Sequence, residues 1–503
     1  MDLYSLISQG LAVCFQPYNL FLCFLGCLLG TLVGVLPGVG PTAAIALLLP
    51  ATFHFTPVSA IIMLAGIYYG AMYGGSTTSI LVNIPGEAAS VVTCLDGYKM
   101  AVDGRAGPAL GIAAFGSYIA GTFSIIGLML VAPPLARVAL AFGPPEYFSL
   151  MCLGLTILIY LASGSIVKAL MMAALGLIIG CIGSDALTNV HRFTLGVPEL
   201  MDGVGLIPLV MGLFGVSEVL LNMEEQIKSE ILKTKIKNLL PNLQDWKRSA
   251  LPILRGSILG FFLGILPGGG AAISSFVSYA VEKKISRHPE RFGKGAIEGV
   301  AGPEAANNSA VGGAFIPLFS LGIPSNPVMA ILLGALMIHG AMPGPHLVNQ
   351  NPDLFWGVIV SMYVGNVMLL ILNLPLIGLW VKLLKVPYLI LFPLILLFCL
   401  IGAYSINNSV FDVLIMCIFG VVGYLFRKFE YQGAPLLLAF VLGPLLDFNL
   451  RHALLVSEGR FRDFFTRPIS AVTLGLAALL LLSNALPAVI KRLAQYRESV
   501  ENG

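Results

Sequence analysis

The sequence predicts an all-α polytopic membrane protein, with two inverted repeats of about five transmembrane helices plus one re-entrant hairpin each, and a C-terminal helix. Three observations carry this prediction: the composition, an internal repeat, and a reversal of flanking positive charge between the two copies. Of the 503 residues, 57% are hydrophobic and only 11% are charged, whereas soluble domains carry roughly 25% charged residues. Uncharged runs such as 305–352 and 386–411 exceed the roughly 20 residues that a spanning helix needs. The solvent of this chain is therefore lipid.

The internal repeat is marked by breaks in apolar segments. Gly34-Val-Leu-Pro-Gly-Val-Gly40 recurs as Gly264-Ile-Leu-Pro-Gly-Gly-Gly270, at an offset of 230 residues. A second break, Asn83-Ile-Pro-Gly86, recurs as Gly322-Ile-Pro-Ser325. Later landmarks keep the same order. We therefore divide the chain into a first transmembrane repeat (1–221), a cytoplasmic linker (222–255), a second transmembrane repeat (256–468), and a C-terminal transmembrane helix with a cytoplasmic tail (469–503).

The positive charges indicate that the two repeats are inverted. Lys and Arg favour the cytoplasmic side of short loops. Residues 222–255 and 282–294 are both basic, so segment 256–281 begins and ends inside, as a re-entrant hairpin would. Its counterpart, 20–50, has no flanking Lys or Arg and is expected to enter from outside. One loop disagrees, since this count places four arginines outside: Arg451, Arg460, Arg462 and Arg467.

The breaks are the first candidates for a binding site. Pro and Gly at membrane depth free backbone groups that lipid cannot satisfy, so such backbone survives only against protein or a water-filled cavity. Helix N-termini suit an anion, and freed carbonyls suit a cation such as Na+. The alternative is close helix packing through small residues. The predicted substrate-binding residues are Gly38, Gly40, Thr42, Asn83, Pro85, Gly86, Gly268, Gly270, Ser274, Asn308, Ser325 and Asn326.

A second group of residues is predicted to couple transport to an ion. These residues are Ser76, Thr77, Glu304 and Asn307, with backbone carbonyls at the breaks as further Na+ ligands. Glu304 follows Pro303, so it either lies in the first turn of a helix or serves as a site acid or proton carrier. Ser and Thr hydroxyls can alternatively bond their own i−4 carbonyls. Asp96 and Lys99 are expected to pair with each other in a loop.

Other chemistries lack their motifs. The six histidines form no metal-binding spacing, and neither a Walker A sequence nor a Gly-x-Ser-x-Gly elbow occurs. We therefore expect neither an enzyme nor a cofactor. No basic block indicates nucleic acid as a partner.

At this point the motifs themselves resemble a known family. Segments 34–41, 69–80, 83–87, 301–308 and 343–345 closely resemble the large membrane subunit of tripartite tricarboxylate transporters, the TctA family, and the resemblance covers nearly the whole chain. The second-half break departs from the family, which often has Gly-x-Pro-Gly where Ser325 stands here.

This resemblance implies a multi-pass permease of the bacterial inner membrane. It implies a small membrane subunit and a periplasmic solute-binding protein as partners, and a dimer of the membrane complex is compatible with it. The implied function is uptake of citrate-like tri- or dicarboxylates or related organic acids by symport, driven by a Na+ or H+ gradient. The four outer arginines are hypothesised to contact one of the partners. Inverted repeats favour alternating access, and the alternative is a passive organic-anion channel.

Overall fold

A computed structural model of the chain describes residues 3–36, 40–161, 165–185, 187–224, 238–384 and 388–482. Within these residues, nine helices are long and apolar enough to cross a membrane, and one small antiparallel sheet is present. The prediction of an all-α polytopic membrane protein is thereby confirmed. Gly38, much of the predicted linker, and the last part of the C-terminal helix with its tail lie outside the described residues.

The chain forms two compact units, Met1–Leu140 with Gly205–Phe429, and Ala141–Val204 with Glu430–Gly503. The first unit contains the helices α1 (Leu3–Cys14), α2 (Pro17–Val35), α3 (Pro41–Leu48), α4 (Pro57–Val82), α5 (Val91–Thr93), α6 (Ala106–Ala139), α9 (Leu206–Val210), α10 (Ser217–Glu224), α11 (Leu243–Ile265), α12 (Gly270–Ile285), α13 (Glu298–Leu321), α14 (Pro327–Ile338), α15 (Leu347–Gln350), α16 (Pro352–Asn373), α17 (Ile377–Leu383), α18 (Tyr388–Asn407) and α19 (Val410–Lys428). The second unit contains α7 (Pro144–Leu161), α8 (Ile166–Gly180), β1 (Gly183–Ser184), β2 (His191–Arg192), α20 (Gly433–Val456), α21 (Asp463–Thr466) and a helix at Pro468–Leu482.

Short 3-10 and π-helical turns complete the two units. Those of the first unit are η1 (Pro50–Thr52), η2 (Ala88–Ser90), η3 (Cys94–Tyr98), η4 (Ala101–Arg105), η6 (Met211–Val216) and η7 (Pro289–Arg291), and the second unit has η5 (Pro198–Leu200). Each unit contains elements of both predicted repeats, so the boundaries of the two units do not coincide with those of the repeats.

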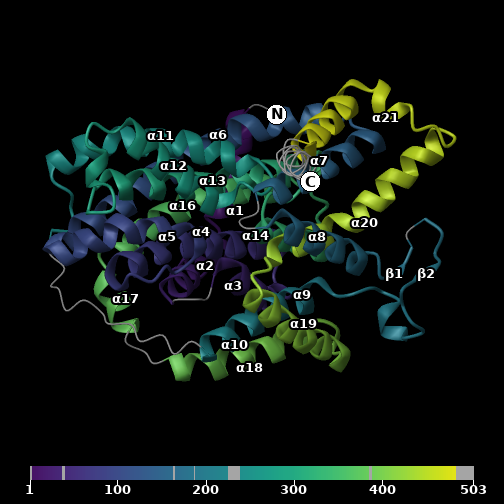
Figure 1. The fold of residues 1–503 in the computed structure, drawn as a ribbon, viewed down its shortest axis with the longest axis horizontal. Helices are drawn as coiled ribbons and strands as arrows, with labels where there is room; N and C mark the ends of the chain where they lie inside the picture. Colours follow the sequence, from purple (N-terminus) through teal and green to yellow (C-terminus); the bar gives the residue numbers. More distant parts are fainter. Residues whose placement is uncertain are drawn as a thin grey trace, which may run out of the picture. The chain divides into compact units, whose positions relative to one another are not determined.

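Two pairs of long helices, α2 with α4 and α11 with α13, form the centre of the first unit. In Figure 1, α11 and α12 lie above α13, and α2 and α3 lie below α4. Glycines one turn apart allow α2 to pack backbone to backbone on α4: a Cβ at Gly30 would lie 2.4 Å from the Ile67 carbonyl oxygen. A Cβ at Gly260 of α11 would likewise lie 2.1 Å from the Ala306 carbonyl oxygen of α13. No side chain larger than hydrogen fits at either contact.

These two contacts belong to one repeated pattern. Glycines 26, 30 and 34 on α2 correspond, at an offset of 230, to glycines 256, 260 and 264 on α11. Their partner carbonyls, at 63, 67 and 71 and at 302, 306 and 310, keep a constant offset of 239. An ordered match of this kind supports the internal repeat through packing geometry, independently of the Pro-Gly breaks.

The short helices that follow the breaks of one repeat pack against elements of the other repeat. Helix α3 follows the first break of the first repeat and packs against α14, which follows the second break of the second repeat. Helix α12 takes the equivalent place in the second repeat and packs against η2 and α5 of the first. The ends of the broken segments from both repeats are thereby brought to the same region of the first unit.

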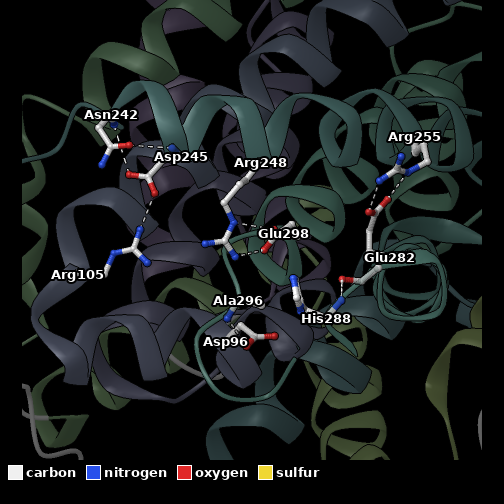
Figure 2. A network of polar contacts seen from close by, with 11 residues as sticks. Asp96, Arg105, Asn242, Asp245, Arg248, Arg255, Glu282, His288, Ala296 and Glu298 are labelled. Carbon is white, nitrogen blue, oxygen red and sulfur yellow. Dashed lines mark hydrogen bonds and ion pairs between the residues drawn. The ribbon is translucent and has the colours of Figure 1, made fainter. Parts of the chain in front are cut away.

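Polar contacts fix the start of α13 on the predicted cytoplasmic side (Figure 2). Arg248 of α11 forms a bidentate pair with Glu298, at 2.8 and 2.9 Å, and Arg105 pairs with Asp245 at 2.6 Å. Asp96 accepts from the Gly295 and Ala296 N–H groups, at 2.8 Å each, and from the Tyr279 hydroxyl. Asp96 therefore anchors the beginning of α13, in place of the expected loop pair with Lys99.

Two of the four outer arginines form short ion pairs within the second unit. Arg451 pairs with Asp185 at 2.5 Å, and Arg467 pairs with Glu146 at 2.7 Å. Arg192 joins the first pair at 2.6 Å from Asp185. The Arg451 guanidinium holds the pKa of the Asp185 carboxyl well below its usual range. These arginines are thus paired within the chain: Asp185 directly follows β1, and Glu146 lies in the first turn of α7.

The repeated glycine contacts generate a test of the packing. We expect Gly30→Ala and Gly260→Ala each to lower the melting temperature of the purified protein, because the added methyl meets backbone and overpacking costs about 1–3 kcal/mol. Gly475→Ala is the control, since nothing lies within 4 Å of its added Cβ and Ala is the better helix former. Equal melting temperatures for all three variants would contradict the close packing.

Candidate functional site

The two breaks of each repeat meet one another. In the second repeat, the Gly268 N–H donates to the Ser325 carbonyl oxygen at 2.8 Å. In the first repeat, Gly86 packs so closely that its Cβ would lie 2.0 Å from the Gly34 carbonyl oxygen. The Thr78 hydroxyl donates at 2.7 Å to the Val35 carbonyl, which the end of α2 leaves free. Backbone groups released by the breaks therefore find partners inside the protein.

The second break has the same shape in both repeats. Helices α4 and α13 end with Asn83 and Gly322 in the left-handed region, at φ 60° and φ 69°. Four residues later, Glu87 and Asn326 are N-caps with nearly identical backbone angles, φ −151° and −154°. The Asn326 side chain accepts from the Met329 N–H and donates to the Tyr68 hydroxyl, at 3.0 and 3.3 Å. The scaffold is thus pseudo-symmetric, but its side chains are not.

Glu304 lies at the polar centre of this region. Its side chain is fully buried on α13. Ser76 of α4 donates to Oε2 at 2.5 Å, Asn307 donates to the same oxygen at 3.2 Å, and Thr93 of α5 donates to Oε1. All three donors are neutral, and no ion pair within the described part of the chain includes Glu304. A buried carboxyl group held only by neutral donors can take up a proton or a cation.

The polar region continues along α13 to α6. Asn308 donates to the Ser117 hydroxyl at 2.7 Å and to the Glu304 carbonyl oxygen at 3.1 Å. Beside this pair a small cavity opens, lined by Tyr73, Ser76, Thr77, Leu110, Ala113, Ala114, Ser117 and Asn373. Hydroxyls and amides therefore connect the Glu304 environment to a space between α4 and α6.

The predicted site residues differ in burial and in hydrogen bonding. Ser76, Asn307, Asn308 and Glu304 are brought together in the polar centre. Ser325 is fully buried, and its hydroxyl oxygen has no hydrogen-bond partner among the described residues. Gly40 caps α3 and a Cβ there would enter open space, and Thr42 in α3 and Pro85 in the second break are half-buried.

The remaining predicted residues have structural partners or open positions. Asn83 is exposed at the end of α4. Gly270 has φ +50°, and its Cβ would lie 3.9 Å from the Cβ of Asn326. The Ser274 hydroxyl donates to the Gly270 carbonyl at 2.7 Å, which is the i−4 alternative raised by the sequence.

One interpretation from the sequence is wrong. Pro303 and Glu304 do not begin a helix, because α13 starts at Glu298 and contains Pro303 in its interior. The reason is tertiary: Asp96 receives the N–H groups just before α13 and so moves its start upstream. Glu304 is therefore placed inside the helix, against α4 and α5, and is no helix cap.

Some site residues were missed by the sequence analysis. Thr93 and Ser117 bond the Glu304 region from α5 and α6, and Tyr68 bonds Asn326 from α4. None of them lies next to a Pro-Gly break, so proximity to a break could not find them. Hydroxyls within uncharged apolar runs were the available signal.

Comparisons with known proteins are consistent with this architecture. The family described as "Tripartite tricarboxylate transporter TctA family" matches residues 20–438. A protein of Agrobacterium vitis described as "Uncharacterized 52.8 kDa protein in TAR-I ttuC' 3'region" is 52% identical over 489 residues, or 97% of each chain. A second, "Uncharacterized protein in TAR-II ttuC' 3'region" of the same organism, is 53% identical over 230 residues, which is 46% of this chain and 95% of that protein. No solved structure matches the chain.

The unpartnered hydroxyl of Ser325 generates a test of the site. We expect Ser325→Ala to reduce substrate uptake several-fold without lowering thermal stability, because removing an unsatisfied buried hydroxyl costs little. Asn83→Ala and Asn308→Ala should also reduce uptake while the protein still inserts in the membrane.

Ser320→Ala is the matched control for this test. Its buried hydroxyl donates to the Ala132 carbonyl at 3.0 Å, so the variant should lose about 1 kcal/mol of stability and keep full uptake. Normal uptake by all three site variants would show that the site lies elsewhere.

Proposed function

The chain belongs to the tripartite tricarboxylate transporter TctA family, and we propose that it is the large permease subunit of a secondary transporter that imports citrate-like tri- and dicarboxylates or related organic acids. Transport is driven by a Na+ or H+ gradient, with alternating access, in the bacterial inner membrane. A small membrane subunit and a periplasmic solute-binding protein complete the transporter. The role is transport rather than catalysis.

The observation that carries this proposal is the meeting of paired helix breaks beside a buried acid. Short helices from opposite repeats converge as α3 with α14 and as α12 with η2, the arrangement by which broken helices bind substrate and coupling ion in inverted-repeat transporters. Glu304 supplies a carboxyl group that can bind and release a proton or a metal cation. A site of this kind can couple an anion to a cation, which a simple pore has no need to do.

The substrate carboxylate is proposed to bind where α3 and α14 begin. We call these residues the neutral lobe: Gly40 and Thr42 at the start of α3, Ser325 and Asn326 at the start of α14, which packs against α3, and Tyr68, which bonds Asn326. The starts of two helices of eight or more residues place free N–H groups and positive partial charge there. The absence of a side chain at Gly40 gives room, and the Ser325 hydroxyl supplies an unused donor.

A passive organic-anion channel is the competing function. It would require a hydrated path and no coupling, and the small cavity beside Ser117 shows that polar space exists in the first unit. A channel, however, gives no role to a fully buried carboxyl group that donors from α4, from α5 and from its own helix hold in place.

Reconstitution distinguishes the transporter from the channel. Proteoliposomes that contain this chain and its small subunit, supplied with the binding protein, should accumulate a radiolabelled tricarboxylate above its outside concentration. An ionophore that collapses the driving gradient should abolish this accumulation. Glu304→Gln, which keeps the shape and removes the ionisable group, should bind the substrate but no longer concentrate it. Equilibration without accumulation by the wild-type assembly would support the channel instead.

The outer arginines generate a prediction about partners. Arg451 and Arg467 form short ion pairs with Asp185 and Glu146 inside the second unit, whereas Arg460 has only a long, exposed pair with Glu458 at 3.9 Å. Arg460 and Arg462 are therefore the two arginines proposed to contact a partner. Reversing both charges, Arg460→Glu with Arg462→Glu, should weaken co-purification with the binding protein or small subunit, because charges at the rim of an interface steer association.

Arg287→Glu with Arg291→Glu is the control for these variants, since it makes the same charge change on exposed residues of the predicted cytoplasmic side. Unchanged association of the Arg460 and Arg462 variant would remove the proposed contact and leave the transport function standing.

A further inference from the structure

Glu87 is a second buried acid beside the polar centre, outside the set of predicted site residues. Only 8% of the residue is exposed. Its Oε2 accepts from the Ala89 N–H as the cap of η2, whereas its Oε1 is inaccessible to solvent and has no hydrogen-bond partner among the described residues. An N-cap uses one oxygen only, so capping does not account for the second. An unsatisfied buried carboxylate oxygen is costly, which indicates a missing ligand.

The free oxygen of Glu87 faces the segment that also holds Glu304. A Cβ at Gly75 of α4 would lie 3.1 Å from Glu87 Oε1 and 3.3 Å from the Ser90 hydroxyl oxygen. The next residue on α4, Ser76, donates to Glu304. Thr93, one turn beyond Ser90, donates to Glu304 as well. The carboxyl groups of Glu87 and Glu304 thus both lie against neighbouring residues of α4 and of segment 88–93.

The equivalent place in the other repeat contains no acid. At the offset of 239, Asn326 replaces Glu87, Ala65 replaces Glu304, Phe315 replaces Ser76 and Leu332 replaces Thr93. The backbone angles of the two N-caps nevertheless agree. We call residues Ser76, Glu87, Ser90, Thr93 and Glu304 the acidic lobe. Two equivalent backbones therefore carry different chemistry: neutral donors in one lobe, and two carboxyl groups with three hydroxyls in the other.

We propose that Glu87 and Glu304 together bind one Na+ ion in the acidic lobe, with the hydroxyl oxygens of Ser76, Ser90 and Thr93 as neutral neighbours. This inference rests on the proposed transport function and names its coupling ion and the residues that hold it. Carboxylate, hydroxyl and carbonyl oxygens are the ligands that hard cations take, several at a time. A proton needs only one carboxyl group, whereas this lobe brings two carboxyl groups and three hydroxyls to one place.

The acidic lobe also explains how the ion and the substrate can depend on each other. Two ionised carboxyl groups buried in the same region repel each other, and no ion pair among the described residues neutralises either one. A substrate anion in the neutral lobe adds further negative charge to the same unit. Bound Na+ removes part of this repulsion, so Na+ should raise the affinity for the substrate, and the substrate should raise the affinity for Na+ by the same factor.

Binding of radioactive Na+ to the purified, detergent-solubilised full chain tests the proposal without requiring transport. Wild-type protein should bind Na+ in the absence of substrate. Glu87→Gln keeps the capping acceptor and removes the charge, so the affinity should fall by at least about tenfold, the loss seen even for groups one shell away from a metal. Glu87→Asp keeps the charge and should retain more of the affinity.

Glu282→Gln is the matched control, because Glu282 is an equally buried glutamate of the same unit that Arg255 already neutralises, at 2.5 Å. Its Na+ affinity should equal that of the wild type. Wild-type affinity in Glu87→Gln, or no Na+ binding to the wild type at any pH, would overturn the proposal. Gradient-driven accumulation of substrate by proteoliposomes that contain the same protein with its small subunit, supplied with the binding protein, would show that the proposed function survives such a result.

Discussion

The structure depends on one kind of contact, the approach of glycine backbone to carbonyl backbone between long helices. Lipid offers no hydrogen bonds, so the backbone groups that Pro-Gly breaks release must be satisfied within the protein. The glycines of α2 and α11 let these helices approach α4 and α13 without intervening side chains. Only at such short separations do the breaks touch, as Gly268 does with Ser325. Removing the glycines would separate the breaks before it altered any polar residue of the site.

Much of the fold could be predicted from the sequence, because its main determinants are compositional and periodic. Uncharged runs indicate lipid-exposed or buried helices, and the recurrence of Pro-Gly breaks indicates two related halves. The glycine pattern of α2 and α11 was present in the sequence as well, at the same offset of 230. The sequence analysis considered close packing of small residues only as an alternative explanation of the Pro-Gly breaks and did not use this glycine pattern, which the structure places at the contacts of α2 with α4 and of α11 with α13.

The site could be predicted in part. Glu304, Ser76 and Asn307 lie next to unusual sequence features, and the structure brings them into contact. Thr93 and the role of Asp96 depend on tertiary contacts between residues about 200 positions apart, such as Asp96 with Ala296. One of the two interpretations of Glu304, a position in the first turn of a helix, is wrong for the same reason. Local sequence rules assign a helix start to Pro303, but a distant carboxylate determines where the helix begins.

The two repeats share a backbone conformation at their second breaks but carry different side chains there, and this difference bears most directly on function. A repeated backbone by itself would create two equivalent places, each able to bind the same ligand. The N-caps show how few substitutions separate them: Glu87 and Asn326 have the same backbone conformation, yet one leaves a carboxylate oxygen unpaired and the other donates an amide to Tyr68. One scaffold thus presents a carboxylate in one place and a neutral amide in the other. In the proposed transporter, a change in the charge of one lobe would alter the free energy of binding in the other, and such an interaction energy is what coupled transport requires.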